Sequence, residues 1–300
     1  MKRLLFFVNP NAGHTEIRSS LMQVIQIFTA GGYDVTVHPT SGPKDLTRQI
    51  AARGADYDLI VCTGGDGTLN EATSGLMQLS NRPPLGYIPG GTVNDVAASL
   101  GLSRDPVVAA QDIVHGVPYP IDIGSFGKEH WFDYVAAFGL FTNVPYETPQ
   151  EDKRIWGKLA YFFNGVQALS EVHPVHARVS WDGKAIEADL LDGLVCSTTS
   201  VGGFRPAKTA NPFEISLNDG LYEVVLVRDI KNIAEFSAVA AKLLRLDFQN
   251  DDYFITCQTS SIRFEFDRPV AWTLDGEFGG SVDNIEIRNN RRAVDIIVPR

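Results

Sequence analysis

The stretch Gly64-Gly65-Asp66-Gly67-Thr68-Leu69-Asn70-Glu71 directly follows an apolar run at residues 59–62. A buried strand that ends in glycines and continues into a helix presents backbone N–H groups and the positive end of the helix dipole to an anion. Asp66 would repel a phosphate by a few kcal/mol at an effective dielectric of about 20 unless a divalent cation lies between them. The loop therefore predicts a metal-nucleotide site. The alternative is a tight turn between strand and helix that binds nothing.

The first part of the chain alternates short apolar or β-branched runs with segments of helical spacing, which predicts βαβ units on a parallel sheet. Three of these runs end in glycine-containing turns, at residues 9–13, 64–68 and 89–92. Ligands bind at the carboxyl ends of the strands in such a sheet, so we expect the three turns to converge. The runs are residues 4–8, 34–38, 58–62 and 85–88.

The pattern of residue types along the chain changes near residue 120. From there on, strand-like runs alternate with turn signals such as Asp182-Gly183 and Asp219-Gly220. We therefore predict an α/β domain at residues 1–122, whose glycine turns would bind a nucleotide, and a mostly β domain at residues 123–292. A last strand near residues 293–300 could return to either domain. Antiparallel strands are expected at residues 175–181, 185–196, 222–228, 253–257, 261–266 and 284–298, and helices at residues 154–169 and 233–244.

Composition limits the class of protein. Three hundred residues exceed the usual size of one hydrophobic core, which favours two domains. The net charge of -10 argues against nucleic acid as a partner and restricts membrane contact to a local, transient one. The three cysteines are odd in number and widely spaced, as in reduced cytosolic proteins. The apolar run at residues 4–8 is too short for a signal peptide, so we expect a cytoplasmic protein that is transiently peripheral to the membrane.

A second glycine turn resembles the first, because it also follows an apolar run and precedes a helical segment. It consists of Gly90-Gly91-Thr92-Val93-Asn94-Asp95. The hydroxyl of Thr92 suits a phosphate. Asn94 and Asp95 suit the cap of the helix that follows, or they contact the hydroxyl of a substrate.

Together, Asn9-Pro10 with Gly13, the GGDGTLNE run and the PGGTVND turn resemble the diacylglycerol kinase catalytic domain, and particularly the soluble bacterial lipid kinases. The resemblance spans nearly the whole chain. GGDGT alone is shared with NAD kinases and is similar to the glycine-rich loop of phosphofructokinases, so it identifies only a superfamily. The combination of the three motifs is far more specific.

This resemblance implies an N-terminal sheet like that of phosphofructokinases and NAD kinases, a mostly antiparallel C-terminal β domain, and an active site in the cleft between them. It also implies that Asp66 acts through magnesium. By the same resemblance, ATP is held by Asn9, Pro10, Asn11, Ala12, Gly13, Thr40, Gly64, Gly65, Asp66, Gly67, Thr68, Asn70, Glu71 and Thr92.

The run Asp275-Gly276-Glu277 resembles the Asp-Gly-Glu motif of the family. Phosphoryl transfer to an alcohol requires a carboxylate that accepts the hydroxyl proton. The resemblance favours Glu277 for this role, and Asp275 could also take it. Without the resemblance, Asp-Gly-Glu would be interpreted as a hairpin turn.

Residues 216–221 resemble the loop that binds a structural magnesium ion in the family. The side chain of Asp219 and the backbone carbonyls of Ser216 and Leu221 would be its ligands. The alternative is a plain Asn-Asp-Gly turn. The cofactor expected from both motifs is Mg²⁺, once with ATP and once as a structural ion.

Two positions depart from close bacterial relatives, which often carry basic residues where this chain has His14 and Ala98. We interpret the chain as a lipid kinase that transfers the γ-phosphoryl group of ATP to diacylglycerol or a related lipid at the membrane surface. One alternative is a kinase of a soluble alcohol or nucleotide, similar to an NAD kinase. Another is a non-catalytic protein that binds nucleotide or lipid. The oligomeric state is open, with a homodimer as one option.

Overall fold

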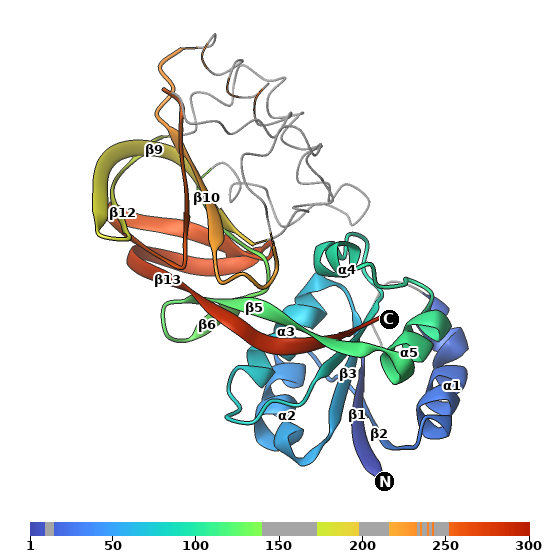
Figure 1. Cartoon of the computed structure of the whole chain (residues 1–300). Helices are drawn as coiled ribbons and strands as arrows, with labels where there is room; N and C mark the ends of the chain where they lie inside the picture. Colours follow the sequence, from blue (N-terminus) through green and yellow to red (C-terminus); the bar gives the residue numbers. More distant parts are fainter. Residues whose placement is uncertain are drawn as a thin grey trace. The chain divides into compact units, whose positions relative to one another are not determined.

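The computed structural model describes residues 1–9, 15–139, 173–197, 216–232, 235, 239, 242 and 252–300. These residues form two compact units, each described by itself (Figure 1). The first unit comprises Met1–Ile123, Trp131–Asp133 and Asn290–Arg300, and the second comprises Gly124–His130 and Tyr134–Asn289. The end of the last strand, from Asn290 on, groups with the first unit, whereas the sequence left open where residues 293–300 return.

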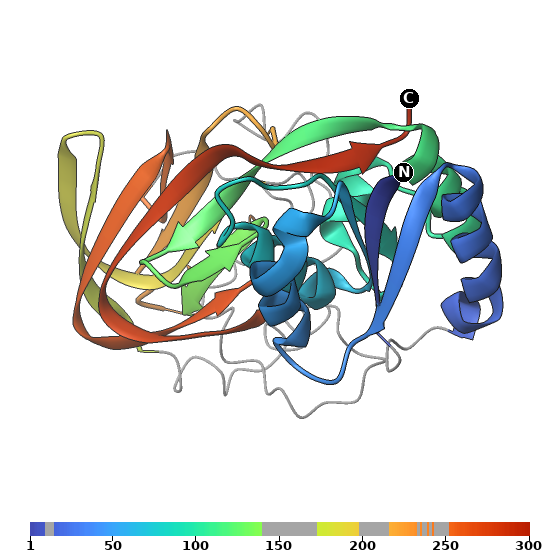
Figure 2. The ribbon, with the colours of Figure 1, turned by 90° about the horizontal axis from the view of Figure 1, so that it is seen from below.

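The first unit is built on four parallel strands: β1 (Lys2–Val8), β2 (Tyr33–Pro39), β3 (Leu59–Gly64) and β4 (Leu85–Pro89). β1 pairs with β2 and β3, and β3 pairs with β4. Figure 2 shows β1 and β2 side by side, in shades of blue. The carboxyl ends of the four strands therefore lie at one edge of the sheet, and this edge carries the loops that the sequence assigns to a ligand.

Helices cover both faces of this sheet. Figure 1 shows α1 (Thr15–Ala30) and α5 (Pro106–His115) on one face and α2 (Asp45–Arg53) and α3 (Asp66–Leu76) on the other. Because successive strand residues point to opposite faces, Leu4, Phe6 and Val8 join the core beneath α1 and α5. A short 3₁₀ turn, η1 (Gly54–Asp56), and the helix α4 (Asp95–Leu100) complete the helical elements described in this unit.

The second unit is built from antiparallel pairs. β9 pairs with β7, β8 and β10, while β12 pairs with β7, β8 and β13. Its core contains Trp272, whose ring lies 4.8 Å from that of Phe138 and 5.3 Å from that of Phe264. The strands are β5 (Val117–Phe126), β6 (His130–Phe132), β7 (Val135–Gly139), β8 (Val175–Trp181), β9 (Lys184–Cys196), β10 (Tyr222–Arg228), β11 (Phe254–Thr259), β12 (Ser261–Leu274) and β13 (Glu277–Val298), of which β5, β6 and β13 also contribute residues to the first unit.

Several predicted bounds need correction. The strands predicted to end at residue 266 and to begin at residue 284 are longer in the structure, as β12 and β13. The helix predicted at residues 154–169 lies outside the described residues. Of the helix predicted at residues 233–244, only Glu235, Val239 and Lys242 are described, and all three are helical. Within the described part of the chain, no helix is both long enough and apolar enough to span a membrane.

Candidate active site

The two glycine turns described at the carboxyl ends of β3 and β4 lie against each other. The Gly90 N–H donates to the Gly64 carbonyl at 2.7 Å. A β-carbon on Gly91 would lie 2.5 Å from the Cα of Gly65, so the approach requires glycine at that position. Two of the three predicted turns therefore converge. Of the third predicted turn, Asn9 follows the end of β1, and the remaining residues lie outside the described residues, as does His14 after it. Those turn residues are Pro10, Asn11, Ala12 and Gly13.

Tyr87 and Asn94 join these two turns from beneath. The buried hydroxyl of Tyr87 lies 2.9 Å from the Gly64 carbonyl, to which it can donate, and 3.1 Å from Asn94 Oδ1. Asn94 has a φ of 57°, and its side chain accepts from the Gly91 N–H at 3.1 Å and donates to the Gly91 carbonyl at 2.7 Å. Asn94 occupies the N-cap of α4 without a side-chain capping bond. The side-chain amide of Asn94 therefore stabilises the conformation of the second turn.

Asp66 begins α3 and faces the second turn. Its Oδ2 accepts from the Asn94 N–H at 2.9 Å. Its Oδ1 is buried and has no hydrogen-bond partner among the residues that the structure describes. Burial, with a smaller contribution from the neighbouring Asp95, raises the pKa of Asp66 to about 6. A buried carboxylate oxygen without a donor is a suitable ligand for a cation, so the fit to a metal-nucleotide is good.

The predicted nucleotide residues of α3 have mixed surroundings. Thr68 packs over Gly64, since a β-carbon on that glycine would lie 2.2 Å from Thr68 Oγ1. Asn70 donates from its side chain to the Trp131 carbonyl at 3.1 Å, and the carboxylate of Glu71 accepts from the Lys44 N–H at 2.9 Å. The side chains of Asn70 and Glu71 therefore contact protein, whereas Gly67 is exposed at the start of the helix.

Arg104 supplies a cation to the second turn. It donates from Nη2 to the Val93 carbonyl at 2.6 Å and lies 3.4 Å from the Thr92 carbonyl. Its charge also acts on the Tyr87 hydroxyl, where it opposes the rise in pKa that burial and Asp66 cause. Thr92 is exposed beside it, and Ala98 is half-buried on α4.

In the second unit, Asp275-Gly276 forms the turn between β12 and β13, and Glu277 is the first residue of β13. The Asp275 Oδ1 accepts from the Tyr134 N–H and the Val135 N–H, both at 3.0 Å. Asp275 is 6% exposed and has a φ of 50°, whereas Glu277 is exposed. The two carboxylates therefore differ: Asp275 holds the backbone at Tyr134 and Val135 in place, whereas Glu277 is exposed to solvent.

The predicted structural-ion loop lies in the same unit. Asp219 Oδ1 accepts from the Leu221 N–H at 2.9 Å, and the Leu221 carbonyl accepts from Asn289 Nδ2 at 3.3 Å. The Ser216 hydroxyl donates to the Asn218 side chain at 3.2 Å. No group of three or more His, Cys, Asp or Glu side chains that could hold a metal occurs within the described ranges. Carbonyls and water would therefore have to supply most of the ligands of an ion here.

Comparison with known proteins gives a consistent result. Residues 3–126 match the model of the diacylglycerol kinase catalytic domain, and residues 142–297 match that of the YegS C-terminal NAD kinase beta sandwich-like domain. The diacylglycerol kinase of Bacillus subtilis (strain 168) is 35% identical over 304 residues, covering 100% of this chain and 97% of the relative. The chain belongs to the diacylglycerol kinase family. This family member is an ATP-dependent lipid kinase.

Further relatives of the kinase agree. The diacylglycerol kinase of Staphylococcus aureus (strain MRSA252) is 29% identical and covers 99% of this chain and 93% of the relative. A solved diacylglycerol kinase structure from Bacillus anthracis strain Sterne has a TM-score of 0.74 at 22% identity, over 99% of this chain and 97% of that chain. A second solved structure from the same strain has a TM-score of 0.82 at 24% identity with the same coverage. These structures support the fold.

Sequence reasoning about the kinase missed Tyr87 and Arg104. Tyr87 lies in an apolar strand run, where its ring suggests only core packing. The available signal was that a buried tyrosine hydroxyl needs a hydrogen-bond partner, and the glycine turns beside it offer carbonyls. Arg104 lies just after the short helix α4, which follows the second turn, and it belongs to none of the sequence motifs.

Proposed function

We propose that this kinase transfers the γ-phosphoryl group of Mg-ATP to the hydroxyl of diacylglycerol or a closely related lipid. The observation that carries the proposal is the pair of glycine turns joined by the Tyr87 hydroxyl, beside Asp66 Oδ1, which has no hydrogen-bond partner within the described part of the chain. Phosphoryl transfer depends on the positioning of phosphates and on charge stabilisation, and this arrangement suits both.

In this proposal, residues 1–122 with the returning strand near 293–300 bind the nucleotide. The glycine turns contact its phosphates through backbone N–H groups, and the hydroxyl of Thr92 assists. Three other residues of the motifs would stabilise the loops instead of contacting the nucleotide, because their side chains are hydrogen-bonded to protein groups. These residues are Asn70, Glu71 and Asn94. The proposed nucleotide contacts are Asn9, Thr40, Gly64, Gly65, Asp66, Gly67, Thr68 and Thr92, together with Pro10, Asn11, Ala12 and Gly13. Asp95 stays a candidate contact to the substrate hydroxyl.

Asp66 would hold the magnesium ion that accompanies ATP, since its buried oxygen lacks a donor within the described residues. When bound, the ion neutralises phosphate charge that would otherwise repel this carboxylate. Asp219, with the carbonyls of Ser216 and Leu221, would hold a second, structural ion. Asp219 Oδ1 already fixes the loop through the Leu221 N–H, which leaves the other carboxylate oxygen for the ion.

Residues 123–292 would bind the acceptor lipid, and Glu277 would accept the proton of its hydroxyl. Glu277 is exposed, whereas Asp275 is committed to two backbone N–H groups. We therefore assign Asp275 to positioning the turn that carries Glu277. The acidic chain would meet the membrane surface locally and transiently, from the cytoplasm.

The test is an assay of purified protein with γ-labelled ATP, Mg²⁺ and a panel of acceptors: diacylglycerol, ceramide, sphingosine and NAD. We expect label in the phosphate ester of diacylglycerol or a close analogue. Label in NAD with none in any lipid would support the soluble-acceptor alternative, and label in no acceptor would refute the proposal.

A further inference from the structure

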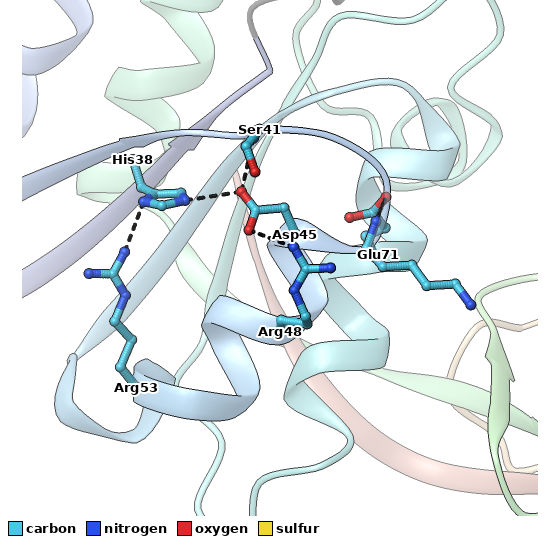
Figure 3. Close-up of polar contacts among 7 residues, drawn as sticks. His38, Ser41, Asp45, Arg48, Arg53 and Glu71 are labelled. Carbon is cyan, nitrogen blue, oxygen red and sulfur yellow. Dashed lines mark hydrogen bonds and ion pairs between the residues drawn. The ribbon is translucent and has the colours of Figure 1, made fainter.

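The turn at residues 40–44, between β2 and α2, is held by carboxylates from two different helices (Figure 3). The Ser41 N–H donates to Asp45 Oδ2, and the Lys44 N–H donates to Glu71 Oε1, both at 2.9 Å. The Thr40 N–H donates to the Val8 carbonyl at the end of β1, also at 2.9 Å. The turn is thus fixed to its own helix, to α3 and to the neighbouring strand.

Asp45 is built for this role. It is 4% exposed and lies 3.2 Å from both His38 Nε2 and Arg48 Nη2. His38 Nδ1 lies 3.1 Å from Arg53 Nη2, and because a guanidinium only donates, that nitrogen must accept and Nε2 must carry the proton given to Asp45. The Ser41 backbone N–H, followed by His38, holds the pKa of Asp45 well below its usual range. Asp45 is therefore a permanent carboxylate under the turn.

Glu71 fixes the other end of the turn. Lys44 has a φ of 61°, a left-handed conformation that costs free energy for any residue with a side chain. The charge-assisted bond from the Lys44 N–H to Glu71 offsets this cost. Thr47 adds a second link, since its hydroxyl donates to the Glu71 backbone carbonyl at 2.8 Å. The turn therefore keeps a fixed position relative to α3, whose first residue is Asp66.

The turn keeps hydrogen-bond donors available for a ligand. Among the described residues, the Thr40 hydroxyl and the Gly42 N–H have no hydrogen-bond partner, whereas the N–H groups of Thr40, Ser41, Lys44 and Asp45 are all bonded. A β-carbon on Gly42 would meet nothing within 4 Å. The turn lies at the carboxyl end of a parallel strand, where ligands bind in such sheets.

We propose that Asp45 and Glu71 are positioning residues of the nucleotide site, which hold the turn so that the Thr40 hydroxyl and the Gly42 N–H both contact the nucleotide. The inference rests on the proposed nucleotide site and deepens it. Preorganised donors lower the ordering cost of binding, so loosening the turn should weaken nucleotide affinity without changing the chemical step.

The experiment measures the Kd of Mg-ATP by titration calorimetry and the kcat of lipid phosphorylation for Thr40→Val, Glu71→Gln and the double variant. Each single change should raise the Kd by about fivefold. The double variant should not exceed the larger single effect by more than about twofold, because Glu71 acts through the turn that carries the Thr40 hydroxyl. For each variant, the rise in the KM for ATP should exceed any fall in kcat. Asp34→Asn is the matched control. This exposed carboxylate lies on β2, the strand that precedes the turn, near the opposite end of that strand.

Gly42→Ala supplies an independent probe, because its β-carbon has open space in the protein and can collide only with a bound ligand. We expect a higher Kd for Mg-ATP with an unchanged Tm. Unchanged Kd values for Thr40→Val and Gly42→Ala would overturn the inference, as would multiplicative effects in the double variant. Calorimetry needs no lipid, so a protein that binds ATP as described but phosphorylates no lipid would refute the proposed function and leave this inference standing.

Discussion

The hydroxyl of Tyr87 lies 2.9 Å from the carbonyl of Gly64, which joins the centre of β4 to the last residue of β3 at the point where the glycine loop begins. The same hydroxyl lies 3.1 Å from Asn94 Oδ1 in the second turn. One buried oxygen thus sets the spacing of both loops. In the proposed nucleotide site, the geometry of the two glycine turns would therefore depend on a residue that is not among the proposed nucleotide contacts.

Tyr87→Phe should weaken both folding and nucleotide binding. The change removes the hydrogen bond of the Tyr87 hydroxyl, while the Gly64 carbonyl keeps the Gly90 N–H and Asn94 Oδ1 keeps the Gly91 N–H, so it should cost about 1 kcal/mol in the free energy of unfolding. We also expect a higher Kd for Mg-ATP, because the two turns lose their common anchor. Urea unfolding and calorimetry measure these effects. Tyr33→Phe on β2 is the control, and equal behaviour of the two variants would contradict the role of Tyr87.

Arg104→Gln should raise the KM for ATP by about threefold to tenfold, since the second turn loses a charged hydrogen bond to the Val93 carbonyl. Arg82→Gln is a matched control, because Arg82 also donates to backbone carbonyls, those of Leu76 and Ala293. Steady-state kinetics at saturating lipid distinguish the two. The same KM for both variants would show that Arg104 stabilises only the fold.

The sequence pattern predicts strands well where apolar residues alternate with polar ones or form an unbroken run. β8 and β10 have the predicted bounds: buried and exposed residues alternate in the first part of β8, and the first six residues of β10 are all buried. β12 was predicted to end at residue 266, before Asp267-Arg268-Pro269, which is a typical turn signal. In the structure, the pairing register of β12 and β13 shifts between Glu265 and Val270, so the strand passes Pro269 through an irregularity.

The residues of the candidate site also differ in how well the sequence predicts their roles. The glycine loops and Asp66 are predictable because their backbone chemistry is local. The roles of Glu71 and Asn94 are not, since each depends on a partner that the tertiary fold brings close: Lys44 for Glu71, and Tyr87 for Asn94. The sequence motif identifies such residues as part of the site but does not separate ligand contacts from supports.

Asp45 should make stability depend on pH in the acid range. Its folded pKa lies below the unfolded value, so its contribution to the free energy of unfolding is fully present above about pH 4–5 and declines as the pH falls below about 4. Asp45→Asn should therefore be less stable than the unmodified protein at pH 7, with a gap that narrows toward pH 3. Urea unfolding across this range is the measurement. A gap independent of pH would contradict the charge argument.

Glu223 on β10 should behave in the opposite way. Burial raises the pKa of Glu223 to about 7, and its Oε2 has no hydrogen-bond partner in the described structure. Because the folded pKa is raised above the ordinary value of 4.5, stability falls as the pH rises from about 4.5 to about 7 and is then constant. Glu223→Gln should add about 1–2 kcal/mol to the free energy of unfolding at pH 8 and little at pH 4. A gain of equal size at both pH values would contradict the assignment.

The assignment of Glu277 as proton acceptor separates the two carboxylates of the Asp-Gly-Glu turn. Asp275→Asn should lower the Tm as well as the activity, because Asp275 holds the backbone of Tyr134 and Val135. Glu277→Gln should keep the Tm and the Kd for Mg-ATP, since its exposed side chain does not shape the turn.

The most direct test is the kcat for transfer from Mg-ATP to diacylglycerol in mixed vesicles, measured for the unmodified protein and for Glu277→Gln. The unmodified protein should phosphorylate diacylglycerol, and Glu277→Gln should lower kcat by about 10²–10⁴-fold, the range expected for a lost general base. Full activity of Glu277→Gln, or no transfer to diacylglycerol by the unmodified protein, would contradict the account.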